Sequence, residues 1–422
     1  MEAVGYAHSA KQAKRIKRFI ENPDSNSGVL TQPKIIEAGE TVTIKSGRQA
    51  ILADTVVDGD LVIEAGGDVF VPAGAGFGDL ESQISLKADT SYVDSKYSGF
   101  KNYIINGDMR VDQRNGGSQV IDSSGLSNYV LDRWQLITRV GATIISGRGE
   151  SEYTKSSTGC TYYNQITINS QKTTASSDQF RLVQSIEAQN INDFKFGTVS
   201  AENITLSFWV NHSIAGTYSG TILGMNGGAY ISYVFTYVQN TANYWEKKTI
   251  NISGCQTGTW GIGNTSGLTV SFDYGSGSTF QTPTLNTWLS GMYLRSSSSL
   301  SPVSTNGAIL KFTGVQLEKG SVDTPFEQRP IGLELSLCQR YYQTINTTFS
   351  ETASTIGANS VKTVSLPTPM RINPIVWENV EGGGGVASVN FTGTTHSALR
   401  VGHILNAVGW YRQSHYQLSA EL

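Results

Sequence analysis

The sequence contains few charged residues. Asp, Glu, Lys and Arg make up 15% of the chain, whereas they make up roughly a quarter of an ordinary soluble domain. The formal net charge is −3, so we expect no nucleic-acid partner and no general attraction to an anionic membrane. The 45 glycines, together with many Ser, Thr and Asn residues, are typical of β-structure with frequent turns.

Long apolar runs are also missing. No stretch approaches the roughly 18 apolar residues that span a bilayer. The basic N-terminal segment is not followed by the apolar core of a secretory signal. We therefore expect neither membrane insertion nor export by this kind of signal.

Cysteine is scarce, and its spacing forms no pattern. The three cysteines, Cys160, Cys255 and Cys338, are far apart and odd in number, with no CxxC pair. This excludes a disulfide framework and a zinc site of the usual spacing. We predict three buried free thiols in a chain that folds in a reducing cytoplasm.

The common catalytic signatures are absent as well. The sequence has no HExxH, no GxSxG, no phosphate loop and no GxGxxG after a strand. We therefore predict that the protein is not an enzyme and needs no cofactor. Glu246, Asp273 and Glu318 could still converge in space as the paired carboxylates of a glycosidase, which leaves a polysaccharide depolymerase as an alternative.

The N-terminal residues 1–27 predict a short helix or arm. Ala and Ile recur at spacings of three and four, giving a weakly apolar stripe, and Pro23 ends the pattern. We predict an attachment arm for an acidic partner, against the alternative of a solvated terminus. Its basic candidates are Lys11, Lys14, Arg15, Lys17 and Arg18.

Residues 28–78 contain a short repeat and predict a small β-domain. The stretch "IEAGETVTIKSG" at 36–47 matches "IEAGGDVFVPAG" at 63–74, so that Val42 aligns with Val69. Each copy alternates apolar and polar residues between glycine turns, which indicates strands in a prism or a short solenoid. Two copies are too few to be stable alone, and other copies of the chain are the simplest neighbours.

Residues 79–100 carry a partial heptad pattern. Leu86, Val93 and Phe100 are spaced by seven, which is the spacing of one coiled-coil seam. We predict a short coiled-coil collar, against the alternative of a polar linker.

From residue 101 onward, strand patterns arrive every ten to fifteen residues. Examples are "NITLSFWVN", "AYISYVFTYVQ" and "AILKFTGVQLE", and no helical pattern intervenes. The whole chain is therefore predicted to be mainly β, with an antiparallel β-sandwich of the jelly-roll type at 101–330. A connecting helix at 331–344 and a small β-rich tip domain at 345–422 follow, in which the "GGGG" run at 382–385 predicts a loop or tight turn.

Aromatic side chains on these strands are candidates for sugar contact. Their flat faces suit the C–H faces of a pyranose, and the polar edges of Tyr and Trp can form hydrogen bonds. Trp209 is the strongest candidate because its strand neighbours Thr205 and Ser207 on the same face are polar. The alternative for each ring is a place in the core. The full set is Trp209, Tyr233, Tyr237, Trp245, Trp260 and Trp288.

Four stretches together resemble bacteriophage tail-fibre or receptor-binding proteins. They are "YIINGDMRVDQRNGG" at 103–117, "YVLDRWQLI" at 129–137, "FTGVQLEKGSVDTPFEQRP" at 312–330 and "ELSLCQRYYQ" at 334–343. The resemblance implies a homotrimer in the virion tail, assembled in the host cytoplasm. It implies that the N-terminus binds the tail or baseplate, and that the distal part meets a host surface polysaccharide. A purely structural baseplate or tail adaptor is the third alternative.

The same resemblance implies a central domain similar to carbohydrate-binding jelly rolls, which often hold a structural calcium ion near their first and last strands. The matching oxygen donors are Asn106, Asp108 and Glu318. The chain has Arg110 where those modules usually carry an acidic residue, a departure that argues against the ion.

Overall fold

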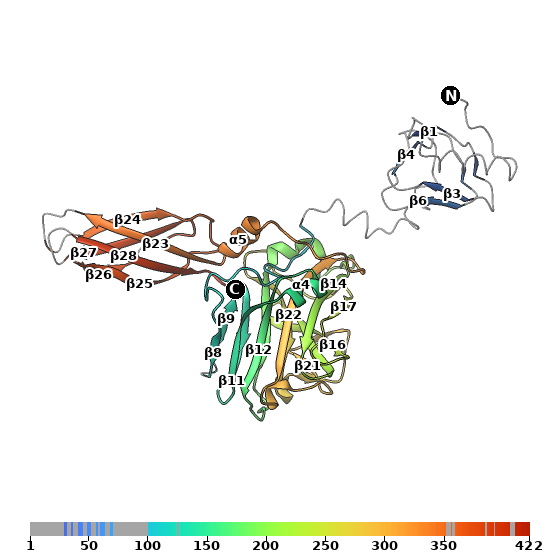
Figure 1. Ribbon diagram of the computed structural model, residues 1–422, viewed down its shortest axis with the longest axis horizontal. Helices are drawn as coiled ribbons and strands as arrows, with labels where there is room; N and C mark the ends of the chain where they lie inside the picture. The colour runs from blue at the N-terminus through green and yellow to red at the C-terminus, as the bar shows by residue number, and fades with distance from the viewer. Residues whose placement is uncertain are drawn as a thin grey trace. The chain divides into compact units, whose positions relative to one another are not determined.

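The computed structural model describes residues 100–422 with short gaps at 124, 126, 352–355, 357–358, 385, 392 and 406–409, and before residue 100 it describes seven short strands alone (Figure 1). The chain divides into two compact units, Met1–Lys96 and Tyr97–Leu422. None of the helices in the described part of the chain is long and apolar enough to cross a membrane.

The seven strands of the first unit pair in parallel. They are β1 (Val29–Thr31), β2 (Ile35–Ile36), β3 (Thr41–Ile44), β4 (Gln49–Ile51), β5 (Val56–Val57), β6 (Asp60–Ile63) and β7 (Asp68–Phe70). The ladders are β1-β4-β7, β2-β5 and β3-β6. This is the pattern of a short parallel solenoid, in which each coil stacks on the next.

The structural repeat of this unit is shorter than the repeat in the sequence. Val42 pairs with Leu61, 19 positions further along, and not with Val69. The register of the strands therefore does not follow the similarity of the two stretches. The arm at 1–27, with Lys11, Lys14, Arg15, Lys17 and Arg18, lies outside the described residues, as does the collar apart from Phe100.

The second unit begins with a sandwich of two antiparallel sheets. One sheet has seven strands in the order β20-β16-β15-β18-β13-β10-β9, and the other has six in the order β17-β14-β22-β12-β11-β8. Figure 1 shows the six-stranded sheet with β8, β11, β12, β22 and β14 side by side. The strands are β8 (Val120–Asp122), β9 (Asn128–Leu131), β10 (Trp134–Ile137), β11 (Thr143–Glu150), β12 (Tyr162–Ser170), β13 (Arg181–Glu187), β14 (Ile204–His212), β15 (Gly216–Asn226), β16 (Ala229–Gln239), β17 (Glu246–Ile252), β18 (Ser266–Asp273), β20 (Trp288–Ser290) and β22 (Ile309–Lys319).

The core lies between the two sheets and follows from strand alternation. In β14, Ile204, Leu206, Phe208 and Val210 are all fully buried. The Phe208 ring lies 4.9 Å from the Phe272 ring of the facing sheet. Every second residue thus packs inward, and the predicted mainly-β antiparallel sandwich is confirmed.

A long connection covers part of the outer face of the seven-stranded sheet. It contains η2 (Ser278–Phe280), β19 (Gln281–Thr282), β21 (Arg295–Ser296) and η3 (Pro302–Ser304). The backbone N–H of Tyr293 donates to Ser232 Oγ at 3.2 Å, and that of Ser296 donates to Ser219 Oγ at 2.9 Å. We call this segment, residues 275–304, the cap. It removes much of this face from solvent.

The chain then enters the tip domain through a short helix. α5 (Ile331–Gln339) leads into two three-stranded sheets, β23-β28-β25 and β24-β27-β26. A separate small core includes Leu399, Val401, Tyr416 and Leu418. The strands are β23 (Tyr342–Glu351), β24 (Asn359–Ser365), β25 (Ile375–Gly384), β26 (Val386–Asn390), β27 (Ala398–Leu405) and β28 (Trp410–Ser419).

The glycine run of the tip domain is strand and not loop over three of its residues. Gly382, Gly383 and Gly384 continue β25 and pair with β28. The register shifts between Val380 and Gly382, and an irregular register of this kind is where glycine occurs within strands. The prediction of a loop at these positions is wrong.

The cysteines occur as predicted. Cys160, Cys255 and Cys338 are all buried and free. Burial raises the pKa of the Cys160 thiol to about 11, so this thiol is protonated and unreactive at neutral pH.

Candidate functional site

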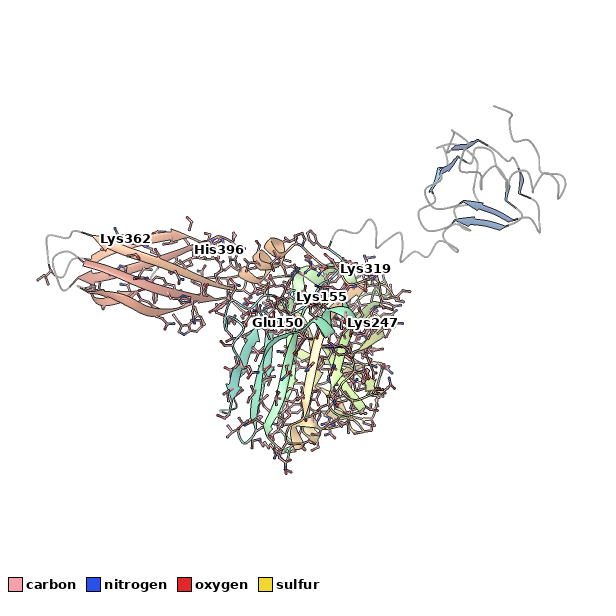
Figure 2. All side chains as sticks on the ribbon, viewed as in Figure 1. Glu150, Lys155, Lys247, Lys319, Lys362 and His396 are labelled. Atoms are coloured by element: carbon pink, nitrogen blue, oxygen red, sulfur yellow. The ribbon has the colours of Figure 1, made fainter. Side chains whose placement is uncertain are left out.

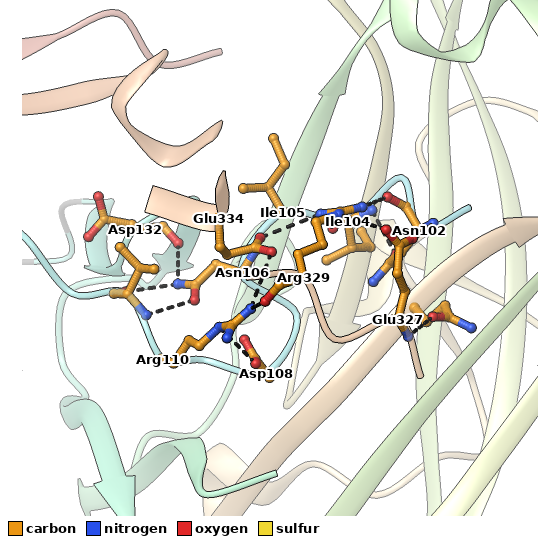
Figure 3. Close-up of polar contacts among 12 residues, drawn as sticks. Asn102, Ile104, Ile105, Asn106, Asp108, Arg110, Asp132, Glu327, Arg329 and Glu334 are labelled. Atoms are coloured by element: carbon orange, nitrogen blue, oxygen red, sulfur yellow. Dashed lines mark hydrogen bonds and ion pairs between the residues drawn. The ribbon is translucent and has the colours of Figure 1, made fainter. Parts of the chain in front are cut away.

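The four stretches that carry the tail-fibre resemblance meet at one end of the sandwich. Figure 3 shows their polar side chains in a single network of hydrogen bonds and ion pairs. Asn106 donates through Nδ2 to the carbonyl oxygens of Val111 and Asp132 at 2.8 and 3.0 Å. The backbone N–H of Asn106 donates to the Glu334 carboxylate of α5. We call this network the hub.

Arg329 closes the hub from the other side. Its guanidinium donates to the carbonyl oxygens of Asn102 and Ile104, and it lies 3.1 Å from the Glu327 carboxylate. It also pairs with Glu334 at 3.5 Å. The segment that enters the sandwich and the segment that leaves it are thereby joined, so these motif residues build architecture rather than an exposed binding surface.

The three oxygen donors considered for calcium do not share a centre. Asn106 Oδ1 accepts the N–H of Val111 at 2.9 Å, and Asp108 pairs with Arg110 at 3.0 Å. Glu318 accepts from Gln316 Nε2 at 2.8 Å and from the N–H of Thr324 at 3.0 Å. No group of three or more His, Cys, Asp or Glu side chains suited to a metal occurs among the described residues.

Arg110 explains this arrangement, because its guanidinium supplies the positive charge beside Asp108. Burial nevertheless raises the pKa of Asp108 to about 6, against the opposing effect of Arg110. The residues present do not fit a calcium ion.

Two of the six candidate aromatic residues belong to the core. Tyr233 and Tyr237 are 3% and 4% exposed. The Tyr237 ring stacks on Tyr218 at 5.6 Å and contacts His212. Their row on β16 faces the opposite sheet, so the prediction that these two rings meet a sugar is wrong.

Trp260 and Trp288 form an aromatic cluster at the margin of the core. Their rings lie 5.7 Å apart, and both contact Phe196. The indole N–H of Trp260 donates to the carbonyl of Thr257 at 3.2 Å, and that of Trp288 donates to Ser253 at 2.7 Å. Their polar edges are therefore occupied by the protein's own backbone.

Trp209 lies on the outer face of the six-stranded sheet. Its strand neighbours Phe208 and Val210 point into the core, so its own side chain points away from it. The ring rests against Gly314 of β22, where an added Cβ would lie 3.0 Å from Trp209 Cδ1. The indole N–H makes no hydrogen bond within the described part of the chain.

Trp245 reaches the same outer face from the loop before β17. The Glu246 carboxylate accepts the backbone N–H groups of Asn240 and Thr241 at 3.0 and 2.7 Å, which closes the loop. The Trp245 ring then lies 5.9 Å from the ring of Tyr163 on β12. Trp245 is only 9% exposed, so its ring packs beneath this surface and offers little area to a ligand.

Tyr163 has room because its cross-strand neighbour on β11 is glycine. Tyr163 pairs with Gly149, and a Cβ at Gly149 would lie 2.4 Å from the tyrosine ring. Lys311 Nζ lies 5.1 Å from the centre of the same ring. Partial burial lowers the pKa of Lys311.

Register places a polar row beside these rings. Gln165, Lys311 and Asn211 are cross-strand partners on β12, β22 and β14. In the neighbouring row, Trp209 pairs with Thr313 of β22 and with Lys247 of the edge strand β17. Figure 2 labels Lys247. We call the surface of Tyr163, Gln165, Trp209, Asn211 and Lys311 the outer platform.

An apolar row lies on the other side of the polar one. Ile309 pairs with Thr167, Thr167 with Ile145, and Ile145 with Ile121, which is 67% exposed. The surface therefore has rings on one side, hydrogen-bonding groups in the middle and aliphatic carbon on the other side. Such a surface can receive an amphipathic ligand such as a sugar chain.

The three carboxylates considered for a catalytic pair have separate structural contacts. Glu246 closes its loop and pairs with Lys248 at 2.7 Å, and Glu318 holds Thr324. Asp273 accepts the N–H of Gly275 at 2.9 Å and lies 3.6 Å from Arg295. They are not brought together as a glycosidase pair.

Sequence reasoning missed Tyr163, Gln165, Asn211 and Lys311. The alternation in "YYNQITINS" already put Tyr163, Gln165 and Thr167 on one face of a strand. Only the pairing order β12-β22-β14 brings that face beside Trp209, and this order joins strands that are far apart in the sequence.

Comparisons with known proteins return structures but no family. No protein-family model and no curated protein matches the chain. TmCBM61 in complex with β-1,4-galactotriose is similar at 10% identity and a TM-score of 0.26, over 52% of this chain and 100% of that one. A family 11 carbohydrate-binding module from Clostridium thermocellum, in complex with a mixed-linked tetrasaccharide, is similar at 10% identity and a TM-score of 0.25, over 49% and 98%.

The enzymatically active domain of tailspike protein 4 from bacteriophage CBA120 is similar at 10% identity and a TM-score of 0.28, over 68% of this chain and 36% of that one. At these identities and TM-scores the solved structures do not indicate a function for this chain.

Proposed function

We propose that this protein is a bacteriophage tail-fibre receptor-binding protein that attaches to a host cell-surface glycan through the outer platform. The single observation that carries the proposal is the row of rings and hydrogen-bonding groups on β12, β22 and β14. Trp209 combines a partly exposed face with an unused indole N–H. Lys311 and Gln165 lie beside it on β22 and β12 and are partly exposed, whereas Asn211 is 6% exposed and its amide donates to the carbonyl of Asn243. A pyranose could therefore stack on the ring and form hydrogen bonds with Lys311 and Gln165.

The wider role rests on the sequence resemblance. We propose that the chain acts as a homotrimer in the virion tail, assembled in the host cytoplasm, with its N-terminal arm on the tail or baseplate. Single sugar sites bind weakly, and three linked copies raise avidity without any new contact. The tip domain offers a second contact surface, because Ile375 and Trp377 are 65% and 48% exposed there.

We propose binding without cleavage. Glu246, Asp273 and Glu318 are each engaged by backbone N–H groups or cations of the protein itself. A glycosidase needs two carboxylates on either side of one bond, and the outer platform as defined contains none.

The decisive experiment measures binding of the full-length protein to immobilised host surface polysaccharide. We expect Trp209→Ala to weaken binding about tenfold, since one ring contributes roughly 1 kcal/mol beyond its buried area. Ile262→Ala is the control, because it removes an exposed apolar side chain that lies outside both the outer platform and the tip domain, and it should retain the wild-type affinity.

Three outcomes would contradict the proposal. Unchanged binding in Trp209→Ala and Tyr163→Ala would exclude the outer platform. Release of new reducing ends by the wild-type protein would identify a depolymerase. No binding of the wild-type protein to any host polysaccharide would favour a structural adaptor.

A further inference from the structure

An arginine without a partner lies on the other sheet of the sandwich. Arg181 opens β13, and its cross-strand neighbours are Ile137 on β10 and Asp273 on β18. The core residue Leu182 follows it, so Arg181 points to the outer face of the seven-stranded sheet. Its exposed fraction is 7%.

Arg181 makes no hydrogen bond and no ion pair in the described part of the chain. Its Nε is sealed from solvent without a hydrogen bond, and no hydrogen bond or ion pair of its terminal nitrogens exists there either. The two terminal nitrogens of Arg181, in contrast to its Nε, remain in contact with solvent. A buried guanidinium normally has its donors satisfied.

The carboxylate of the neighbouring residue Asp273 already has hydrogen-bond and ion-pair partners. Asp273 accepts the N–H groups of Gly275 and Ser276 at 2.9 and 3.1 Å and lies 3.6 Å from Arg295. Arg295 is itself 3% exposed and fixed by carbonyl oxygens of the cap. The charge of Asp273 is therefore shared with Arg295, and it compensates the positive charge of Arg181 only in part.

A second positive charge lies close to Arg181. Arg139 comes two residues after Ile137, the cross-strand partner of Arg181 on β10. Burial lowers the pKa of Arg181 to about 10, so it remains a cation at neutral pH.

We propose that Arg181, with Arg139 beside it, forms a second ligand site that takes the carboxylate of an acidic ligand such as a uronic acid. The planar fork of a guanidinium matches a carboxylate with two parallel hydrogen bonds. This site lies on the opposite sheet from the outer platform and does not depend on it.

The test uses thermal unfolding of the full-length protein with sodium glucuronate, glucose or inorganic phosphate at constant ionic strength. Glucuronate should raise the Tm of the wild type by several degrees, and glucose should not. Arg181→Met should abolish this shift and weaken the Kd for glucuronate at least tenfold. Lys195→Gln, which also removes one positive charge but from an exposed pair with Glu202, should keep the shift.

The unliganded variant gives an independent readout. Without glucuronate, Arg181→Met should have a Tm equal to or above that of the wild type, because it removes a buried, unpaired charge. A lower Tm would show a structural role for Arg181 and overturn the proposal. Arg181→Lys, which keeps the charge without the fork, should lose most of the shift even if the methionine variant fails to fold.

Two further results would also overturn the proposal. A glucuronate shift that persists in both Arg181 variants would place the carboxylate elsewhere. Stabilisation by phosphate but not by glucuronate would assign the site to a phosphate group. Because the outer platform is tested by Trp209→Ala, failure of either proposal leaves the other standing.

Discussion

At the scale of single residues, the contact between Trp209 and Gly314 links backbone conformation to the proposed binding face. Gly314 has a φ of +57°, in the left-handed region that costs other residues roughly 1–2 kcal/mol. We expect Gly314→Ala to lower the free energy of unfolding by about this amount and to displace the indole. Chemical unfolding and tryptophan emission would measure the two effects.

Gly307 provides the control for this variant. It also has a positive φ, +73°, but nothing lies within 4 Å of an added Cβ. Gly307→Ala should cost stability without changing the tryptophan spectrum or glycan binding. If Gly314→Ala leaves the spectrum unchanged, the indole does not depend on this glycine.

A second residue-scale prediction concerns His212 in the core. It is fully buried against Tyr218 and Phe312, and burial lowers its pKa to about 3. The unfolded chain, with a histidine pKa near 6.5, binds the proton first, so stability from this group is present above pH 6.5 and is lost as the pH falls toward 3. Between pH 6.5 and 5 we expect a loss of about 2 kcal/mol.

His212→Phe should remove this pH dependence while keeping the ring packing. It should also cost about 1 kcal/mol at pH 7.5, since Tyr237 loses its contact with His212 Nε2. Urea unfolding at several pH values measures both quantities. The exposed His396 is the comparison, because His396→Gln should keep the wild-type slope; an unchanged slope in His212→Phe would refute the assignment.

At the scale of elements, the sandwich and the tip domain are tied by a buried ion pair. Arg133, beside β10, pairs with Glu421 beyond β28, and the two side chains are 2% and 8% exposed. The Arg133 guanidinium also lies 3.5 Å from the centre of the Tyr341 ring. Removing one partner of such a pair leaves a buried charge and costs roughly 3–5 kcal/mol.

Glu421→Gln should therefore destabilise the protein by about this amount, and the tip domain should unfold at lower denaturant than the sandwich. Circular dichroism during denaturation would follow both transitions. Glu202→Gln, which breaks an exposed pair with Lys195, should change nothing measurable. A single unshifted transition in Glu421→Gln would show that the pair does not hold the domains together.

The alternation of apolar and polar residues made most strands of the sandwich predictable. It did not always show which row of side chains on a strand faces the core. In β14 the apolar row and the polar row differ, so Trp209 was assigned to the outer face correctly by its neighbours. In β16 both rows contain apolar or aromatic residues, and Tyr233 and Tyr237 turned inward. A sheet covered on both sides, here by the core and the cap, loses the contrast on which the prediction depends.

Whole-molecule organisation was the least accessible from sequence. Four stretches carried the sequence resemblance, but the sequence did not show that they lie together. Their side chains are far apart in the sequence and meet in the hub. The solenoid register differs from the sequence repeat, because Val42 pairs with Leu61 and not with Val69. Non-local pairing of this kind leaves no periodic signal in one chain.

The proposed trimer is the prediction that belongs to the whole molecule. The described strands of the solenoid make two full coils and one further strand. This is too few repeats to be stable alone, so copies of the chain are expected to stabilise one another. Native mass measurement should give a particle near three times 45.6 kDa. A stable, folded particle of one chain mass across dilution would contradict it.

The hub also has a mechanical consequence. Asn102 and Ile104 on entry are bonded to Arg329 on exit, and Asn106 to Glu334. Tension applied between the N-terminal part and the tip would therefore pass through these few contacts and bypass the strands of the sandwich. The sandwich would then lie outside the path of the force, so such a pull would leave the shape of its sheets undisturbed.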